Sequence, residues 1–154
     1  MSAGTDKSTI ISWSEKYNTG IEFVDSQHKE LVNLTNQLYK ACLSGHETAK
    51  TVFKEAMNRM VNYVRFHFGA EEELLLRINY PSYAEHKKQH EQLIQKILDA
   101  AKNYNDGKKF VPNQFVRTLQ EWVFSHIAFY DKQFSFFVDE QKSKGLLTNE
   151  MING

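Results

Sequence analysis

The chain has 154 residues, the length of one domain with one hydrophobic core. Hydrophobic residues make up 41% of the chain and charged residues 25%, the profile of an ordinary globular protein. The 19 basic residues balance the 19 acidic ones, so the charge gives no reason to expect nucleic acid or an anionic membrane surface as a partner.

Residues 1–20 show no helical period and are expected to form an extended arm, anchored by Trp13 and Tyr17. Beyond them, apolar residues recur at spacings of three and four, which is the period of an α-helix. The predicted helices run from about 24 to 43, 47 to 77, 82 to 104 and 112 to 143. Pro81 lies just before the third helix and Pro112 at the start of the fourth, so both mark helix starts. Residues 145–154 are expected to form a loose tail.

Short links between long amphipathic helices are typical of an up-down-up-down bundle. No run of alternating apolar and polar residues indicates strands. The chain is therefore predicted to be a single all-α domain over 1–154, with a four-helix bundle over 21–144 and an extended N-terminal arm.

Histidines are spread over all four predicted helices. Of the six in the chain, His46 lies in the link between the first two helices and is expected to be a bystander. The other five are His28, His67, His86, His90 and His126. Taken singly, a helical histidine is more often a surface or satisfied core residue than a ligand. Five of them on four helices can converge in the core, which is how bundles build metal sites.

Two pairs share one helix face because their members are four residues apart. His67 and Glu71 form one pair, and His86 and His90 form the other. Either pair can chelate a metal, but each also suits a helix surface, as a hydrogen bond or a solvated face.

The spacing of His126 and Asp131 is awkward for a regular helix. Five residues turn about 500°, so the two side chains would point roughly 140° apart. If both serve one site, the turn containing Ala128 and Phe129 must be widened, as in a π-bulge. The alternative is that Asp131 is a solvated charge beside Lys132.

The odd number of histidines has a consequence if two metals share both carboxylates and a solvent-derived oxygen. Five imidazoles must then divide as three and two, which leaves one metal six-coordinate and the other five-coordinate. The open position suits a small ligand such as dioxygen. Imidazole ligands and an open position are typical of iron sites, whereas structural zinc sites are usually four-coordinate and closed.

Four blocks in order resemble the hemerythrin family, in its single-domain bacterial form. They are Trp13-x3-Tyr17-x2-Gly20-Ile21-x3-Asp25-x-Gln27-His28, His67-Phe68-x2-Glu71-Glu72, Tyr80-Pro81-x4-His86-x3-His90 and Trp122-x3-His126-Ile127-x3-Asp131. The resemblance runs from about residue 11 to 137. It implies a centre of two non-haem iron ions bridged by an oxo or hydroxo group.

The resemblance also implies a role for each position. His86, His90 and His126 would bind the six-coordinate iron, His28 and His67 the five-coordinate iron, and Glu71 and Asp131 would bridge. Dioxygen would bind at the open iron in an apolar pocket of Leu31, Phe68, Trp122, Val123 and Ile127, although these residues also suit ordinary core packing.

Many family members carry leucine where this chain has Val123, and the smaller side chain would open the pocket. We therefore predict that Val123→Leu slows autoxidation; an equal or faster rate would contradict this.

The expected function is dioxygen carriage, storage or delivery, and not catalysis, because oxidative di-iron enzymes in bundles typically use more carboxylate ligands. An oxygen or redox sensor and a di-iron oxidase or peroxidase are the alternatives. The expected partners are dioxygen and an oxygen-consuming enzyme, and we expect a monomer. The single cysteine, the lack of a signal-peptide pattern and the lack of an apolar run of ~18 residues favour a cytoplasmic protein without membrane insertion.

Overall fold

The structure is a computed structural model that describes residues 10–43, 47–105 and 112–154. Its helices are α1 (Glu22–Leu43), α2 (Glu47–Arg77), α3 (Tyr83–Asn105), α4 (Pro112–Ser125), α5 (Lys132–Ser143) and α6 (Asn149–Asn153), with a 3-10 turn at Glu15–Tyr17 and a π-helical turn at His126–Asp131. These described ranges contain no strand. The prediction of an all-α fold is confirmed, and the predicted helix bounds differ from the observed ones by at most two residues.

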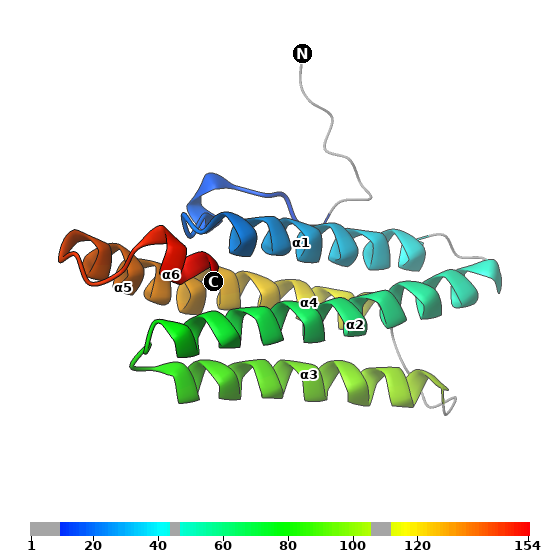
Figure 1. Cartoon of the computed structure of the whole chain (residues 1–154). Coiled ribbons are helices and arrows are strands. Elements are labelled where there is room, and N and C mark those ends of the chain that lie inside the picture. Colours follow the sequence, from blue (N-terminus) through cyan, green and yellow to red (C-terminus); the bar gives the residue numbers. More distant parts are fainter. Residues whose placement is uncertain (1–9, 44–46, 106–111) are drawn as a thin grey trace, which may run out of the picture.

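The bundle has four long rods, because the π-helical turn joins α4 to α5 without a break. Successive rods run in opposite directions, which confirms the predicted up-down-up-down arrangement (Figure 1). α1 packs against α2 and α4, and α2 also packs against α3. No helix in the described part of the chain is long and apolar enough to cross a membrane.

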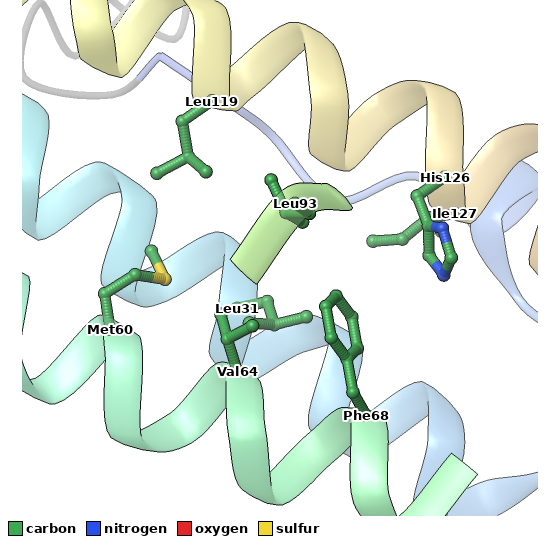
Figure 2. Close-up of a pocket in the computed structure, with 8 residues that line it drawn as sticks. All are labelled: Leu31, Met60, Val64, Phe68, Leu93, Leu119, His126 and Ile127. Carbon is green, nitrogen blue, oxygen red and sulfur yellow. The ribbon is translucent and has the colours of Figure 1, made fainter. Parts of the chain in front are cut away.

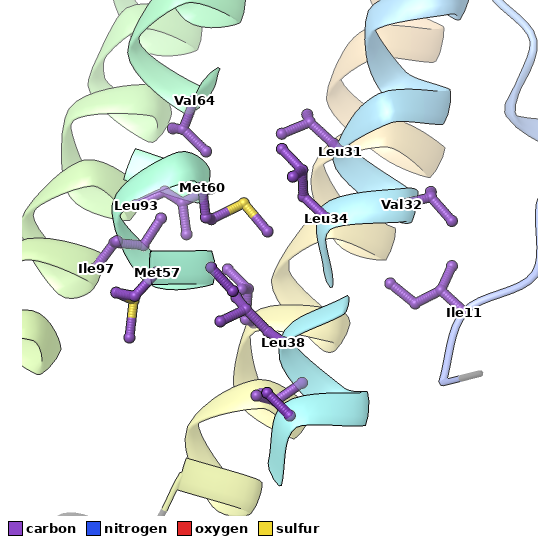
Figure 3. Packing of buried hydrophobic residues seen from close by; sticks show 14 of the residues in the cluster. Ile11, Leu31, Val32, Leu34, Leu38, Met57, Met60, Val64, Leu93 and Ile97 are labelled. Atoms are coloured by element: carbon purple, nitrogen blue, oxygen red, sulfur yellow. The ribbon is translucent and has the colours of Figure 1, made fainter. Parts of the chain in front are cut away.

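Two separate apolar clusters form the core. The larger cluster fills most of the bundle and includes Leu38, Met60 and Ile97, which Figure 3 shows packed between neighbouring helices. The smaller cluster lies further along the bundle, around Leu74 and Phe134, both fully buried. Helices α1 and α2 contribute residues to both clusters, so each has a segment that lies between the two clusters.

The N-terminal arm lies along α1 (Figure 1) and is tied to it by one side chain. Asn36 Oδ1 accepts hydrogen bonds from the backbone N–H groups of Ile10 and Ile11 at 2.9 and 3.0 Å, and its Nδ2 donates to the Ile11 carbonyl at 2.9 Å. Tyr17 is buried and Trp13 packs against the larger cluster, so both predicted anchors are confirmed. Residues 1–9 of the arm lie outside the described residues.

The tail is not loose, contrary to expectation. It contains α6, whose first turn is capped by the Thr148 hydroxyl. Ile152 is buried in the smaller cluster, and Arg77 donates to its carbonyl at 2.6 Å. A helix of five residues is too short to show a periodic pattern in the sequence, and its order depends on these contacts with α2.

Candidate metal centre

Where the two apolar clusters meet, every rod carries buried polar side chains. On α1, His28 lies between Val24 of the smaller cluster and Leu31 of the larger one. On α2, His67 and Glu71 lie between Val64 and Leu74 in the same way. All seven predicted ligands lie in this layer with at most 7% of their surface exposed: His28, His67, Glu71, His86, His90, His126 and Asp131. Solvated positions for His86, His90 and Asp131 are therefore excluded.

One oxygen of each carboxylate faces the group formed by His86, His90 and His126. Glu71 Oε1 contacts His86 Nε2 and lies 3.2 Å from His90 Nε2 and 3.6 Å from His126 Nε2. Asp131 Oδ1 lies 3.2 Å from His86 Nε2 and 3.1 Å from His126 Nε2. These three imidazoles and two oxygens thus surround one point.

The other oxygen of each carboxylate lies on the side of His28 and His67. Asp131 Oδ2 lies 2.7 Å from His28 Nε2. Glu71 Oε2 lies 3.3 Å from His67 Nε2 and 3.4 Å from His28 Nε2. The five imidazoles therefore divide as three and two, and both carboxylates span the two groups.

These donor atoms suit metal ions better than they suit one another. Neighbouring ligands of an ion with bonds of about 2.1 Å lie about 3 Å apart, which is close to the distances observed here. Within the described residues, six buried side-chain atoms lack a hydrogen-bond partner, and five of them point into this cluster: Nε2 of His28 and His67, Oε2 of Glu71, and both oxygens of Asp131. Ring nitrogens and oxygens that are close but misaligned for hydrogen bonding can both be satisfied by a cation between them.

The π-helical turn places His126 and Asp131 in the same site. It begins at His126, ends at Asp131, and contains Ala128 and Phe129. A π-helix bonds residues five apart, so it returns Asp131 to the face of His126, and their side chains approach to 3.1 Å. The predicted widening of this turn is confirmed.

Two histidines have polar partners on their outer nitrogen. His67 Nδ1 lies 2.7 Å from Gln27 Oε1, and His90 Nδ1 lies 3.1 Å from Glu72 Oε2. Since both partners accept hydrogen bonds, each ring carries its proton on Nδ1 and turns the Nε2 lone pair inward. The Phe68 ring stacks on His90 with a centroid distance of 3.7 Å and an interplanar angle of 1°. The sequence signals for Gln27 and Glu72 were only their positions beside His28 and Glu71, and their contacts were not predicted.

In most of these residues, the charge of the facing groups shifts the pKa in the direction opposite to the shift caused by burial. Burial lowers the pKa of an imidazole, but the facing carboxylates outweigh it and raise the pKa of His28 and His86 to about 9 and that of His126 to about 10. For His67 burial prevails and lowers the pKa. Burial also acts to raise the pKa of Glu71 and Asp131, yet the imidazoles hold both below their usual range. The two carboxylates are thus ionised at neutral pH, the form that binds cations.

An apolar cavity adjoins the cluster (Figure 2). Phe68 and His126 lie at one end of it, and Met60 and Leu119 lie toward the other. The lining residues are Leu31, Met60, Val64, Phe68, Leu93, Leu119, His126 and Ile127. Three of the five predicted pocket residues are among them.

The structure tests only one of the other two predicted pocket residues. Trp122 is half-buried and is absent from the lining; Lys96 Nζ lies 3.9 Å from its ring centroid. The side chain of Val123 lies outside the described residues. Met60 and Val64 were not predicted to line the cavity, although both lie at helical spacings from Phe68 on α2.

The sequence of most of the chain matches the model of a known protein family. Residues 19–135 match the hemerythrin HHE cation binding domain. The chain belongs to the hemerythrin family. The matched range contains all seven residues of the cluster and the whole π-helical turn.

Known hemerythrins are similar to this chain over most of its length. The bacteriohemerythrin of Stenotrophomonas maltophilia is 29% identical over 126 residues, which cover 82% of this chain and 80% of that protein. The bacteriohemerythrin of Pseudomonas aeruginosa PAO1 is 33% identical over 115 residues, which cover 75% and 72%. A solved structure of wild-type hemerythrin is 25% identical, with a TM-score of 0.77 over 82% of this chain and 96% of that one.

Proposed function

We propose that this hemerythrin binds dioxygen reversibly at a non-haem di-iron centre and serves in oxygen carriage, storage or delivery, without acting as an enzyme. One observation supports the proposal most: the oxygens of Glu71 and Asp131 are shared between a group of three histidines and a group of two. Bound iron would supply the electrons and the open coordination position that dioxygen binding needs.

In this proposal the chain's own residues hold the two ions unequally. His86, His90 and His126 bind one iron, and His28 and His67 bind the other. Glu71 and Asp131 would bridge them, together with an oxo or hydroxo group of solvent origin. The group of two histidines has one protein ligand fewer, so the open position would lie on its side.

The surroundings favour binding over oxidation of a substrate. The five imidazoles are neutral donors when they bind metal, whereas oxidative di-iron proteins in bundles typically use more carboxylates. Leu31, Phe68 and Ile127 give the adjoining cavity apolar walls. Apolar walls exclude water and so limit the proton entry that would promote loss of reduced oxygen.

The test is a cycle of oxygenation and deoxygenation on the purified protein. After anaerobic reduction, admission of air should produce a visible absorption band that disappears when oxygen is removed, over repeated cycles. Metal analysis of the same sample should give two irons per chain. Irreversible bleaching, or steady oxygen consumption with a reductant, would instead support a di-iron oxidase or peroxidase, and one zinc per chain would contradict the proposal.

Delivery by a cytoplasmic monomer to an oxygen-consuming enzyme completes the proposal. Size-exclusion chromatography with light scattering tests the monomer directly. An increase in cellular oxygen uptake at low oxygen, lost in a variant that cannot bind iron, would support delivery.

A further inference from the structure

The two metal positions differ in the charge of the groups behind their histidines. Glu72 presents a carboxylate to His90 in the group of three, whereas Gln27 presents a neutral amide to His67 in the group of two. We propose that Glu72 and Gln27 are positioning residues that set the reduction potentials of the two irons apart. This inference rests on the proposed di-iron site.

His90 is held from two directions by the same face of α2. Phe68 and Glu72 are four residues apart, so their side chains lie one above the other. Phe68 covers the ring face of His90, and Glu72 accepts from its Nδ1–H. The side chain of Glu72 is only 19% exposed, so water screens its negative charge weakly.

His67 is held by an equally defined but uncharged partner. The Gln27 amide oxygen accepts from Nδ1–H at 2.7 Å. The backbone carbonyl of Gln27 in turn accepts from the Tyr63 hydroxyl at 3.2 Å, and Tyr63 lies one turn before His67 on α2. Gln27 is thus tied to α2 twice, by its side-chain amide at His67 and by its backbone carbonyl at Tyr63.

The charge difference changes the donor strength of the two imidazoles. A carboxylate that accepts from Nδ1–H draws the proton toward itself and makes Nε2 more electron-rich, which stabilises ferric iron. A neutral amide orients the ring with a smaller effect, because hydrogen bonds to charged acceptors are roughly twice as strong. The iron bound by three histidines is therefore the harder to reduce, and the iron with the open position is the easier to keep ferrous.

Two reciprocal variants test this with little change in shape. Glu72→Gln removes the charge behind His90, and Gln27→Glu adds one behind His67. The reduction potentials of the loaded protein are measured by spectroelectrochemistry after metal analysis has verified two irons per chain. We expect Glu72→Gln to shift its ferric–ferrous equilibrium toward the ferrous form at least tenfold, which is about 59 mV for one electron. Gln27→Glu should shift the equilibrium in the opposite direction.

Matched controls separate this local effect from a general effect of charge. Glu73→Gln removes an exposed carboxylate next to Glu72, and Asn33→Asp adds an exposed one to α1. Both should leave the potentials within a factor of two in equilibrium constant. The double variant of Glu72 and Gln27 should bring the two potentials closer together or invert their order.

The outcomes distinguish this inference from the proposed function. If the natural protein holds two irons but the reciprocal variants shift no more than the controls, the inference is wrong and the proposed function stands. If the natural protein holds no iron pair, both are wrong. If only one of the two variants binds two irons, the direction in which its ferric–ferrous equilibrium shifts still tests the inference, because each variant is predicted to shift it in a stated direction.

Discussion

Glu71 and Asp131 are the residues on which the cluster depends, because each presents its two oxygens to different histidines. Neither carboxylate is exposed to solvent. Two buried ionised carboxylates need compensating positive charge. Protonated imidazoles supply it when no metal is bound, and metal ions would supply it when bound. Protons and metal therefore compete for the same atoms.

This competition predicts that metal loading releases protons. The pKa values of His28, His86 and His126 lie at about 9 to 10, above neutral pH, so these rings are protonated before metal binds and must be neutral afterwards. Apparent affinity should therefore increase as the pH rises toward 9 and decrease as it falls. Anaerobic calorimetry with ferrous iron at pH 7, in two buffers of different ionisation enthalpy, measures the release. Identical heats in both buffers would contradict it.

Phe68 and Phe66 form a natural comparison on α2. Phe68 is 2% exposed and stacks on His90, whereas Phe66 is 60% exposed. Phe68→Ala should lower the free energy of unfolding by about 3–5 kcal/mol, because it leaves a cavity in the core. Phe66→Ala should cost less than about 1 kcal/mol. Urea denaturation of the metal-free variants measures both, and equal losses would show that the Phe68 site collapses or that Phe66 is buried in solution.

At the scale of the elements, the decisive feature is the π-helical turn between α4 and α5. A π turn contains one residue more than the α-helical turn it replaces. The residues on either side keep their faces, so Leu119 before the turn joins the larger cluster while Phe134 after it joins the smaller one. The extra residue is what brings Asp131 to His126 at a spacing of five.

Changing the length of this turn should have opposite results in the two directions. Deleting Ala128, which is exposed, leaves His126 and Asp131 four residues apart, and a regular α-helix then keeps them on one face. We expect this variant to retain two irons per chain. Inserting a second alanine after Ala128 should rotate Asp131 by about 100° and reduce the iron content below two. Metal analysis and circular dichroism distinguish the cases; loss of iron on deletion, with helix content unchanged, would show that the π geometry itself is required.

At the scale of the whole molecule, the cluster joins all four rods at the level between the two apolar clusters. Elsewhere the rods are held largely by apolar contacts. Ligands from α1, α2, α3 and the π-helical turn make any bound metal a link between segments far apart in the sequence.

Removal of metal should consequently lower the thermal stability without unfolding the bundle. At a free metal concentration about 1,000 times the dissociation constant, binding stabilises the fold by about 4 kcal/mol. For a domain of this size, about 2–4 °C is lost per kcal/mol, so the chelated protein should melt roughly 8–16 °C lower. Differential scanning calorimetry with and without chelator measures the shift. An unchanged melting temperature would contradict binding at this site.

Periodicity along the chain was enough to predict the four rods, because residues three or four apart share a face of a helix. The seven candidate ligands and the widened turn were predicted from the placement of histidines and carboxylates on those helices together with the resemblance to the family. The packing of the helices was needed to show which carboxylate oxygen faces which histidine, that Gln27 and Glu72 lie behind His67 and His90, and that α6 docks on α2. It also decided that Trp122 is absent from the cavity lining. The physical reason is that contacts between helices depend on how the helices cross and on side-chain rotamers, and neither is written in the spacing along one helix.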